Sequence, residues 1–182
     1  MSEPVIAGRI QDMDQFQKIL EHLMNDVMQS SLEDHKVMIS EVPLANPKTR
    51  EELVERLFSE FKVPKLYLGN SAVLALFATG RTTGTVVDSG YGITHTVPIY
   101  EGFALPFATK EVPICGKDIT NFLHDMLMKK HTTVWEDNSD FKYEAEKFKI
   151  KFGKVCQDFD AEIKSANDNK DEKDRKYKLP NG

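Results

Sequence analysis

The sequence has little of what marks secreted, membrane-spanning or nucleic-acid-binding proteins. Its 182 residues include two cysteines, Cys115 and Cys156, which are too few for a disulfide framework and form no C-x-x-C pair. A reducing, intracellular compartment therefore fits best. No apolar run approaches the roughly 18 residues that a membrane-spanning helix needs. The first residues lack the basic and apolar stretches of a signal peptide, so we expect none.

Positive charge is also in short supply. The chain has 24 lysines and arginines against 29 aspartates and glutamates, a net charge of −5, and no long basic cluster. This balance argues against nucleic acid as a partner. Hydrophobic residues make up 40% of the chain and charged residues 29%, which is an ordinary globular mixture. The length suits one domain or a large part of two.

The first 80 residues alternate between amphipathic helical patterns and short apolar runs, which is typical of an α/β fold. We expect, in chain order, an extended lead-in over 1–11, helix 13–28, strand 37–40, helix 50–61, strand 65–68 and helix 71–79. Asp12 with Gln15 predicts the N-cap of the first helix, and Thr49 with Glu52 predicts a capping box for the second. Pro64 is expected to end the second helix.

The chain after residue 100 predicts one more strand and two helices. We expect the strand around 109–112, a helix over about 118–130 and a long helix over 141–165. Apolar residues share one face of the first of these helices: Ile119, Phe122, Leu123, Met126 and Leu127. His124 lies on another face, where solvent exposure is the simplest expectation. The apolar stripe of the long helix is more typical of core than of a seam for a partner helix. Residues 165–176 should form a mobile loop.

Residues 84–97 predict a β-hairpin whose turn could carry chemistry. Residues 85–87 suit a buried strand, and 93–97 alternate as a returning strand does. The turn Asp88-Ser89-Gly90-Tyr91-Gly92 contains two glycines, which allow positive φ and a close approach of backbone to a ligand. Successive N–H groups in such a turn can hold an anion, and Asp88 could hold a water on Mg²⁺. Most such segments are plain hairpins, and the pattern alone leaves that alternative open.

Several stretches carry a resemblance to a known family. Gly80-Arg81-Thr82-Thr83-Gly84 and residues 88–102, followed by Ala104-Leu105-Pro106, resemble the second phosphate-binding hairpin of the actin family nearly letter for letter. Residues 40–44, 50–51, 58–61 and 63–64 resemble further elements of the family in the same order. The resemblance implies an α/β, actin-like ATPase fold of the ribonuclease H-like type.

The resemblance also implies how the chain divides. Residues 1–80 resemble part of the first large subdomain, and 81–130 resemble the second large subdomain with its phosphate-type hairpin. Residues 131–182 resemble part of a small subdomain, with the long helix and a mobile charged loop. Because the chain aligns with the middle of an actin, we expect an incomplete fold that lacks the N-terminal strands, with the first phosphate loop, and the C-terminal half. The two short strands should then leave an open sheet edge and exposed apolar patches.

The resemblance implies a role for each matching residue of the hairpin. Asp88 would hold Mg²⁺ through water. Ser89, Gly90 and Gly92 would offer backbone N–H groups to the phosphates of ATP or ADP. His95 would lie near the attacking water and is the candidate catalytic residue.

Two more matching residues lie further along the chain. Gly116 resembles the family glycine that lies close to the nucleotide, and Lys149 would lie beside the nucleoside. With these two positions, the resemblance implies ATP or ADP with Mg²⁺ as the cofactor.

Other positions depart from the family pattern. Ser71 falls where the family has a water-positioning glutamine, and serine is too short to reach the same water. Tyr91 replaces the second aspartate of the hairpin, and Ile150 replaces a ribose-contacting carboxylate. Ala7 falls on the histidine that is methylated in many actins. These differences favour an actin-related protein over a conventional actin, and a chain that does not catalyse hydrolysis on its own.

Three functional interpretations remain open at this stage. The first is an actin-like, ATP-binding, filament-related protein of the cytoplasm and cytoskeleton, here a catalytically incompetent fragment, with actin-like subunits or actin-binding proteins as partners. The second is a non-catalytic protein-interaction module that keeps the partner cleft of the family, marked by Tyr67, Phe77 and Phe103. Plain core packing is the alternative for those three aromatic residues. The third is a gene fragment without independent activity. None involves a membrane or nucleic acid.

Overall fold

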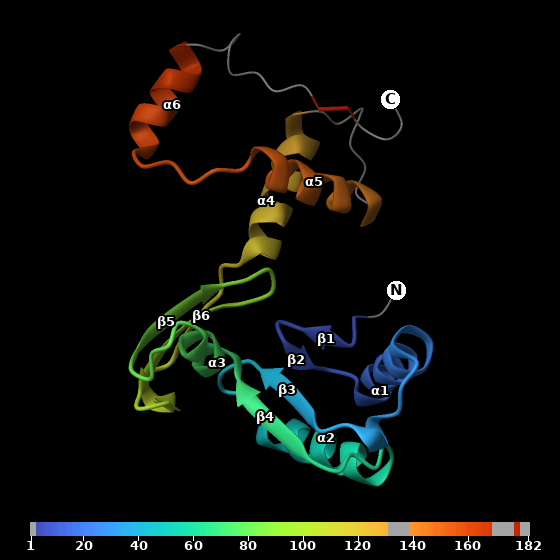
Figure 1. Ribbon diagram of the computed structural model, residues 1–182. Coiled ribbons are helices and arrows are strands. Elements are labelled where there is room, and N and C mark those ends of the chain that lie inside the picture. Colours follow the sequence, from blue (N-terminus) through green and yellow to red (C-terminus); the bar gives the residue numbers. More distant parts are fainter. Residues whose placement is uncertain (1–2, 131–138, 169–176, 179–182) are drawn as a thin grey trace. The chain divides into compact units, whose positions relative to one another are not determined.

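The computed structural model describes residues 3–130, 139–168 and 177–178 (Figure 1). Its chain forms two compact units, residues 1–116 and 117–182, which are described separately below. Most of the mobile loop expected over 165–176 lies outside the described residues; its first residues, up to Asp168, end a helix.

The first unit contains short helices and eight short strands among its described residues. In chain order these elements are β1 (Val5–Ile6), β2 (Arg9–Ile10), α1 (Met13–His22), η1 (Leu23–Met28), η2 (Leu32–Asp34), β3 (Val37–Glu41), α2 (Pro47–Ser59), β4 (Leu66–Asn70), α3 (Ser71–Ala78), β5 (Gly84–Ser89), β6 (Thr94–Tyr100), β7 (Phe103–Ala104), η3 (Pro106–Ala108) and β8 (Lys110–Val112). The strands and helices predicted from the sequence are confirmed in order, and their bounds shift by a few residues.

The first helix begins where the sequence predicts. The Asp12 side chain accepts a hydrogen bond from the Gln15 N–H at 2.9 Å, which satisfies one of the free donors of the first turn. The α-helical part ends at His22, and the chain continues to Met28 as a π-helix. Gln29 then ends the helix in the left-handed region, with φ of 50°. The lead-in before this helix is a small hairpin, in which β1 pairs antiparallel with β2 through a turn at Ala7 and Gly8.

The predicted capping box of the second helix is wrong. Helix α2 begins at Pro47, and the Asn46 side chain accepts a hydrogen bond from the Lys48 N–H at 2.9 Å. Asparagine is among the best N-cap residues and proline suits the first helical position, so this pair starts the helix before Thr49 is reached. The helix ends at Ser59, ahead of Pro64.

Strands β3 and β4 form a parallel two-stranded sheet in the register Val37↔Leu66 to Glu41↔Asn70. One face of this sheet packs on a core of four buried residues: Met13, Leu53, Leu57 and Val63. Val37 and Ile39 of β3 lie against that core, whereas Met38 points away and is 56% exposed. Helices α1 and α2 thus cover one face of the sheet.

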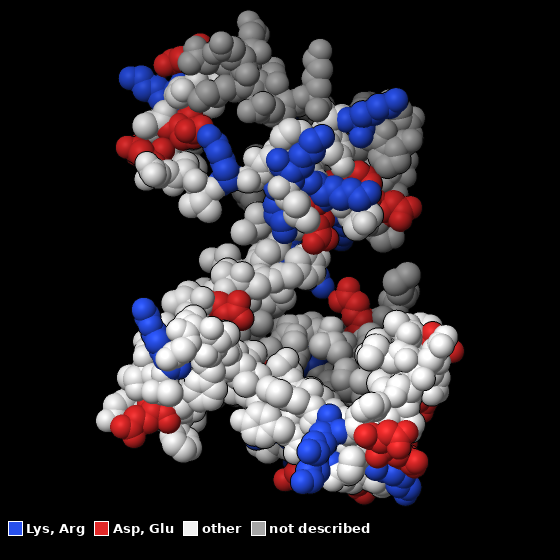
Figure 2. All heavy atoms as spheres, in the orientation of Figure 1, with Lys and Arg blue, Asp and Glu red and all other residues white. Residues whose placement is uncertain are grey.

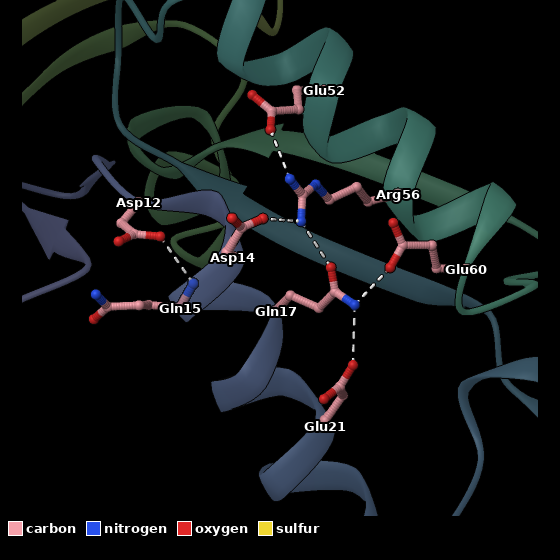
Figure 3. Close-up of polar contacts among 8 residues, drawn as sticks. All are labelled: Asp12, Asp14, Gln15, Gln17, Glu21, Glu52, Arg56 and Glu60. Atoms are coloured by element: carbon pink, nitrogen blue, oxygen red, sulfur yellow. Dashed lines mark hydrogen bonds and ion pairs between the residues drawn. The ribbon is translucent and has the colours of Figure 1, made fainter.

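A polar network ties α1 to α2 beside this core (Figure 3). It joins one guanidinium, one amide and four carboxylates: Arg56, Gln17, Asp14, Glu21, Glu52 and Glu60. Arg56 donates to the Gln17 Oε1 atom at 2.8 Å and pairs with Asp14 at 2.6 Å. The hydrogen bond to Asp14, the largest cause, raises the pKa of Arg56 above its ordinary value.

The second sheet of this unit is antiparallel and four-stranded. Strand β6 lies at its centre, with β5 on one edge and both β7 and β8 on the other. The sheet packs with α3 around five buried residues: Ala72, Val73, Leu76, Val97 and Ile99. The Asn70 side chain caps α3 by accepting from the Ala72 and Val73 N–H groups.

The second unit contains α4 (Gly116–Lys130), α5 (Ser139–Phe152) and α6 (Phe159–Asp168) among its described residues. The expectation that His124 of α4 is exposed to solvent is wrong. Thr120 and His124 are its buried residues, whereas Ile119, Phe122 and Met126 are each more than half exposed. Lys149 of α5 donates to the Thr120 Oγ1 atom at 2.7 Å, so the polar face of α4 is the one that meets α5.

The single long helix predicted over 141–165 is also wrong. Helix α5 ends at Phe152, and the Gly153 N–H donates to the Lys149 carbonyl at 2.7 Å at that end. Glycine is a poor residue for continuing a helix. Asp158 then starts α6 by accepting from the Ala161 N–H. The apolar stripe is divided accordingly: Ala145 is fully buried, but Val155 between the helices is 99% exposed. Lysines of α5 gather on the face shown in Figure 2.

Candidate functional site

The end of the β5–β6 hairpin places an acid opposite an imidazole. Asp88 pairs in register with His95, and the His95 Nε2 atom lies 3.7 Å from the Asp88 Oδ2 atom. His95 is 1% exposed, and neither of its ring nitrogens has a hydrogen-bond partner. The Asp88 side chain is 54% exposed. A buried polar atom without a partner costs about 1–3 kcal/mol, so this imidazole favours an added water or ligand group beside it.

Side chains brace the turn from both of its strands. The Ser89 and Thr94 hydroxyls lie 3.0 Å apart, and the Thr94 hydroxyl donates to the Ile114 carbonyl at 2.5 Å. The Gly90 N–H donates to the Ile93 carbonyl at 2.9 Å, which closes the turn. A phosphate at this position would have to compete with that bond for the Gly90 N–H.

The two turn glycines do not use the positive φ that glycine allows. Positive φ occurs at Gly8, Gly80 and Gly102 among the described glycines, and not at Gly90 or Gly92. Space, not conformation, explains Gly92, because a Cβ atom there would lie 3.2 Å from the Ala7 Cα atom. The β1–β2 turn therefore packs directly against the phosphate-type turn.

A second carboxylate stands on the other side of His95. Glu111 of β8 is the register partner of His95 on the edge opposite Asp88. Its carboxylate pairs with the Arg9 guanidinium from β2. Directly opposed residues share a sheet face, so the imidazole lies in a row between two acids. The sequence offered no sign of Glu111, because it reaches the site from a short strand through tertiary pairing. The family resemblance had marked Ala7, but not its contact with Gly92.

The structure brings most of the predicted nucleotide residues together. Asp88, Ser89, Gly90, Gly92 and His95 belong to one hairpin. The Gly116 N–H joins them by donating to the Gly90 carbonyl at 2.9 Å. Lys149 belongs to the other compact unit, where its amine donates to Thr120.

No three His, Cys, Asp or Glu side chains come together to hold a metal ion in the described parts of the chain. Asp88 is solvent-exposed and could hold a water molecule of a hydrated Mg²⁺ ion, which retains several of its waters in most protein sites. These residues therefore suit a Mg²⁺ ion that arrives bound to phosphates better than a metal site formed by protein side chains alone.

The three aromatic residues of the proposed partner cleft are exposed. Tyr67 is 58% exposed, Phe77 44% and Phe103 77%, which rules out plain core packing for them. Gly102, immediately before Phe103, lies so close to Phe77 that a Cβ atom there would be 3.0 Å from its ring. Phe77 and the Gly102–Phe103 segment therefore form one apolar surface.

The second unit holds a polar cluster that the sequence did not predict. The Glu144 carboxylate accepts hydrogen bonds from Lys147 at 2.8 Å and from the Tyr177 hydroxyl at 2.7 Å. These two hydrogen bonds hold the pKa of the Glu144 carboxyl below its ordinary value, and the bond to Glu144 raises the pKa of Tyr177. The Tyr177 ring packs edge-on against Phe148, with centroids 5.3 Å apart.

Comparison with protein families gives one finding. The family model described as Actin matches residues 1–182, the whole chain. No helix in the described residues is long and apolar enough to cross a membrane.

Proposed function

The chain belongs to the actin family, and from this premise we propose that its β5–β6 hairpin forms one wall of a site for ATP or ADP with Mg²⁺. The observation that carries the proposal is the buried His95, whose ring nitrogens have no partner, beside the exposed carboxylate of Asp88. A bound nucleotide with its waters would supply the missing hydrogen-bond partners.

Each hairpin residue has a distinct role in this proposal. Asp88 holds a water of the cation, and the backbone N–H groups of Ser89 and Gly92 face the phosphates. The Gly90 N–H joins them when a phosphate displaces its bond to the Ile93 carbonyl. His95 positions a water through a ring nitrogen. Magnesium, when bound, neutralises phosphate charge. Gly116 keeps the turn in place through its bond to the Gly90 carbonyl, and Lys149 has the nucleoside role that the family resemblance gives it.

We propose that these 182 residues do not hydrolyse ATP by themselves. Hydrolysis depends on groups held around the γ-phosphate from more than one side, and one hairpin reaches it from one side. Ser71 at the start of α3 is too short to orient a water as a glutamine would. Tyr91 and Ile150, which are 51% and 72% exposed, carry no carboxylate toward the ribose or phosphates.

The finer family assignments belong to the same proposal. The fold is of the ribonuclease H-like type and incomplete in this chain. Its subdomains are residues 1–80, 81–130 and 131–182, and the setting is the cytoskeleton of the cytoplasm. A filament role follows from the family and would require partner subunits.

The test is to titrate the chain with Mg-ATP and follow backbone amide and His95 ring signals by NMR. We expect weak binding with shifts confined to the hairpin turn and His95, lost in Asp88→Ala and kept in the control Asp26→Ala. Shifts spread over the chain, or none, would overturn the site. Turnover of ATP that disappears in Asp88→Ala would overturn the proposed lack of hydrolysis.

A second function is favoured by the exposed aromatic surface. The chain could act as a protein-interaction module that binds actin-like subunits or actin-binding proteins through Tyr67, Phe77 and Phe103. Phe103→Ser should weaken binding to purified actin monomers, because it removes an exposed apolar side chain that a bound partner would cover. Phe107→Ser, which changes another exposed phenylalanine, is the matched control.

A further inference from the structure

His95 is buried between two carboxylates and yet forms no hydrogen bond with either. Its side chain is 1% exposed, and neither ring nitrogen has a partner among the described residues. Asp88 is its register partner on β5, and Glu111 is its register partner on β8. A carboxylate is a ready acceptor for an imidazole N–H, so the lack of any such bond in this row needs a physical cause.

The two carboxylates are kept from the ring in different ways. The Asp88 side chain is 54% exposed, and its Oδ2 atom lies 3.7 Å from the His95 Nε2 atom, which is beyond hydrogen-bond distance. The Glu111 carboxylate instead pairs with the Arg9 guanidinium. The first carboxylate therefore faces water, and the second is held by an arginine.

This arginine comes from the hairpin that packs on the phosphate-type turn. Arg9 lies in β2, close after Ala7, whose Cα atom would be 3.2 Å from a Cβ atom at Gly92. The side chains of Arg9 and Glu111 are 29% and 35% exposed, so the pair is partly shielded from water. Arginine carries a full positive charge and a fork of donors that matches a carboxylate, so it outcompetes a neutral imidazole N–H for Glu111.

The pairing of β6 with β8 places Glu111 within reach of the ring. Residues directly opposed in an antiparallel pair share a sheet face, with Cβ atoms about 4.5–5.5 Å apart. From that distance the side chain of a glutamate can bring a carboxylate oxygen to a ring nitrogen of the opposed histidine. The ion pair with Arg9 draws the carboxylate toward β2 instead.

We propose that Arg9 is a positioning residue of the hairpin site, which holds the Glu111 carboxylate away from the His95 ring and so keeps a ring nitrogen free for a water or a bound nucleotide. This role rests on the proposed function, in which His95 positions a water. Without Arg9, the Glu111 carboxylate would turn to the ring and occupy the nitrogen that the water needs. The buried imidazole would then be satisfied by protein and would no longer favour an added group.

A purely structural role for the ion pair makes a different prediction. If Arg9 and Glu111 only tied β2 to β8, removing either side chain would loosen the same contact and would affect His95 in the same way. If Arg9 restrains Glu111, the two removals have different results. A bond from His95 to Glu111 can form only when Arg9 is absent and Glu111 is present.

The experiment follows the His95 ring N–H by NMR of the full chain, without nucleotide, at pH 8, where a free imidazole is neutral. In Arg9→Met we expect this N–H to exchange with water at least about tenfold more slowly than in the parent chain, since it gains a carboxylate acceptor. Arg9→Lys, which keeps the positive charge, should stay close to the parent. Glu111→Ala and the double variant Arg9→Met/Glu111→Ala should show no slowing, because the acceptor is gone.

The matched control is Arg50→Met. Arg50 pairs with Glu41 at 3.1 Å in the same unit, and Glu41 is opposed by Asn70 rather than by a histidine. This variant loses the same charge as Arg9→Met and should leave the His95 ring unchanged. The thermal midpoint of each variant shows whether it folds, and Arg9→Gln repeats the test if Arg9→Met does not fold.

Addition of Mg-ATP separates this role from the nucleotide site itself. In Arg9→Met the His95 shifts should need at least about tenfold more nucleotide than in the parent chain, because the bond to Glu111 must first break. The double variant has the net charge of the parent chain and should restore the shifts. If Mg-ATP causes no shifts in the parent chain, the proposed nucleotide site fails, whereas a slowed ring N–H in Arg9→Met still supports the restraint of Glu111.

Two outcomes would overturn the proposal. The first is equal exchange of the ring N–H in Arg9→Met and the parent chain, since Glu111 would then not bond the ring when it is released. The second is the same change in Arg9→Met and in Glu111→Ala, since the ion pair would then act only as a tie between strands.

Discussion

Two of the three sheets in the described part of the first unit, the parallel pair β3–β4 and the four-stranded hairpin sheet, differ in how the edges of their strands are paired. Strand β6 has neighbours on both edges, and its Val97 is fully buried beneath α3. Strand β3 has a neighbour on one edge, and the other edge borders an apolar groove. The hairpin sheet is therefore self-sufficient in its pairing, whereas the parallel sheet depends on α1 and α2 to hold it. The difference separates a sheet whose middle strand is paired on both edges from a sheet whose two strands are each paired on one edge.

The largest expected effect comes from emptying one core at a time. Leu57 is 1% exposed under the parallel sheet, and Leu57→Ala should lower the free energy of unfolding by about 2–5 kcal/mol. Hydrogen exchange should accelerate in β3 and β4 and stay slow in β6. Leu76→Ala in the other core is the control and should show the reverse pattern. Equal acceleration in both sheets would mean that they open as one unit.

A smaller effect is expected at the contact between the two hairpins. Gly92→Ala places a Cβ atom 3.2 Å from the Ala7 Cα atom, and backbone cannot yield as a side chain can. We expect a loss of about 1–3 kcal/mol in urea denaturation. The control is Gly84→Ala, whose new atom meets the flexible end of Leu76 and should cost less. If the two variants were equally stable, the close contact would not matter.

The cap of α2 tests what holds the parallel sheet in place. Asn46→Ala removes the acceptor for the Lys48 N–H and should destabilise the chain by about 1 kcal/mol in the same assay. Thr49→Ala should have little effect on the helix start, because α2 begins before it. A larger loss of stability in Thr49→Ala than in Asn46→Ala would support the capping box that the sequence predicted.

Lowering the pH should destabilise the second unit. It should not change how the two sheets of the first unit differ in stability. The pKa of Glu144 is lowered in the folded chain by hydrogen bonds from Lys147 and Tyr177. Because the pKa of this carboxyl is lower in the folded chain than in the unfolded chain, the carboxylate stabilises the fold at pH values above its unfolded pKa, near 4 to 5. This stabilisation is lost as the pH falls through the pKa of the folded chain. Thermal melts from pH 6 downward should show this loss, reduced in Glu144→Gln. An unchanged pH dependence in that variant would contradict the assignment.

The local signals of the sequence predicted much of the first unit. Asp12 caps α1 as predicted. The two strands expected within residues 84–97 are found as β5 and β6, and their register in the structure sets Asp88 opposite His95. Competing local signals explain two errors. Asn46 with Pro47 outranks Thr49 as a helix start, and Gly153 with Asp158 interrupts a helix that an apolar stripe seemed to continue.

Other features depend on contacts that no local pattern contains. The amphipathic pattern of α4 identifies which residues are apolar, but the buried residues of α4 are Thr120 and His124, and Lys149 of α5 donates to Thr120. In the same way, Glu111 reaches the row beside His95 through β8, and nothing near residue 111 signals it. The positions of these residues depend on contacts between elements that are distant in the chain, and the local sequence does not reveal those contacts.

The contact of Gly92 with the backbone of Ala7 links two positions that are distant in the chain. A side chain at residue 92 would press on the backbone of residue 7, which itself holds a φ of 51°. A larger residue at position 92 therefore requires that backbone to shift by a few tenths of an ångström, whichever side chain residue 7 carries. Over evolutionary time glycine should be retained at position 92 for as long as the β1–β2 turn keeps its place.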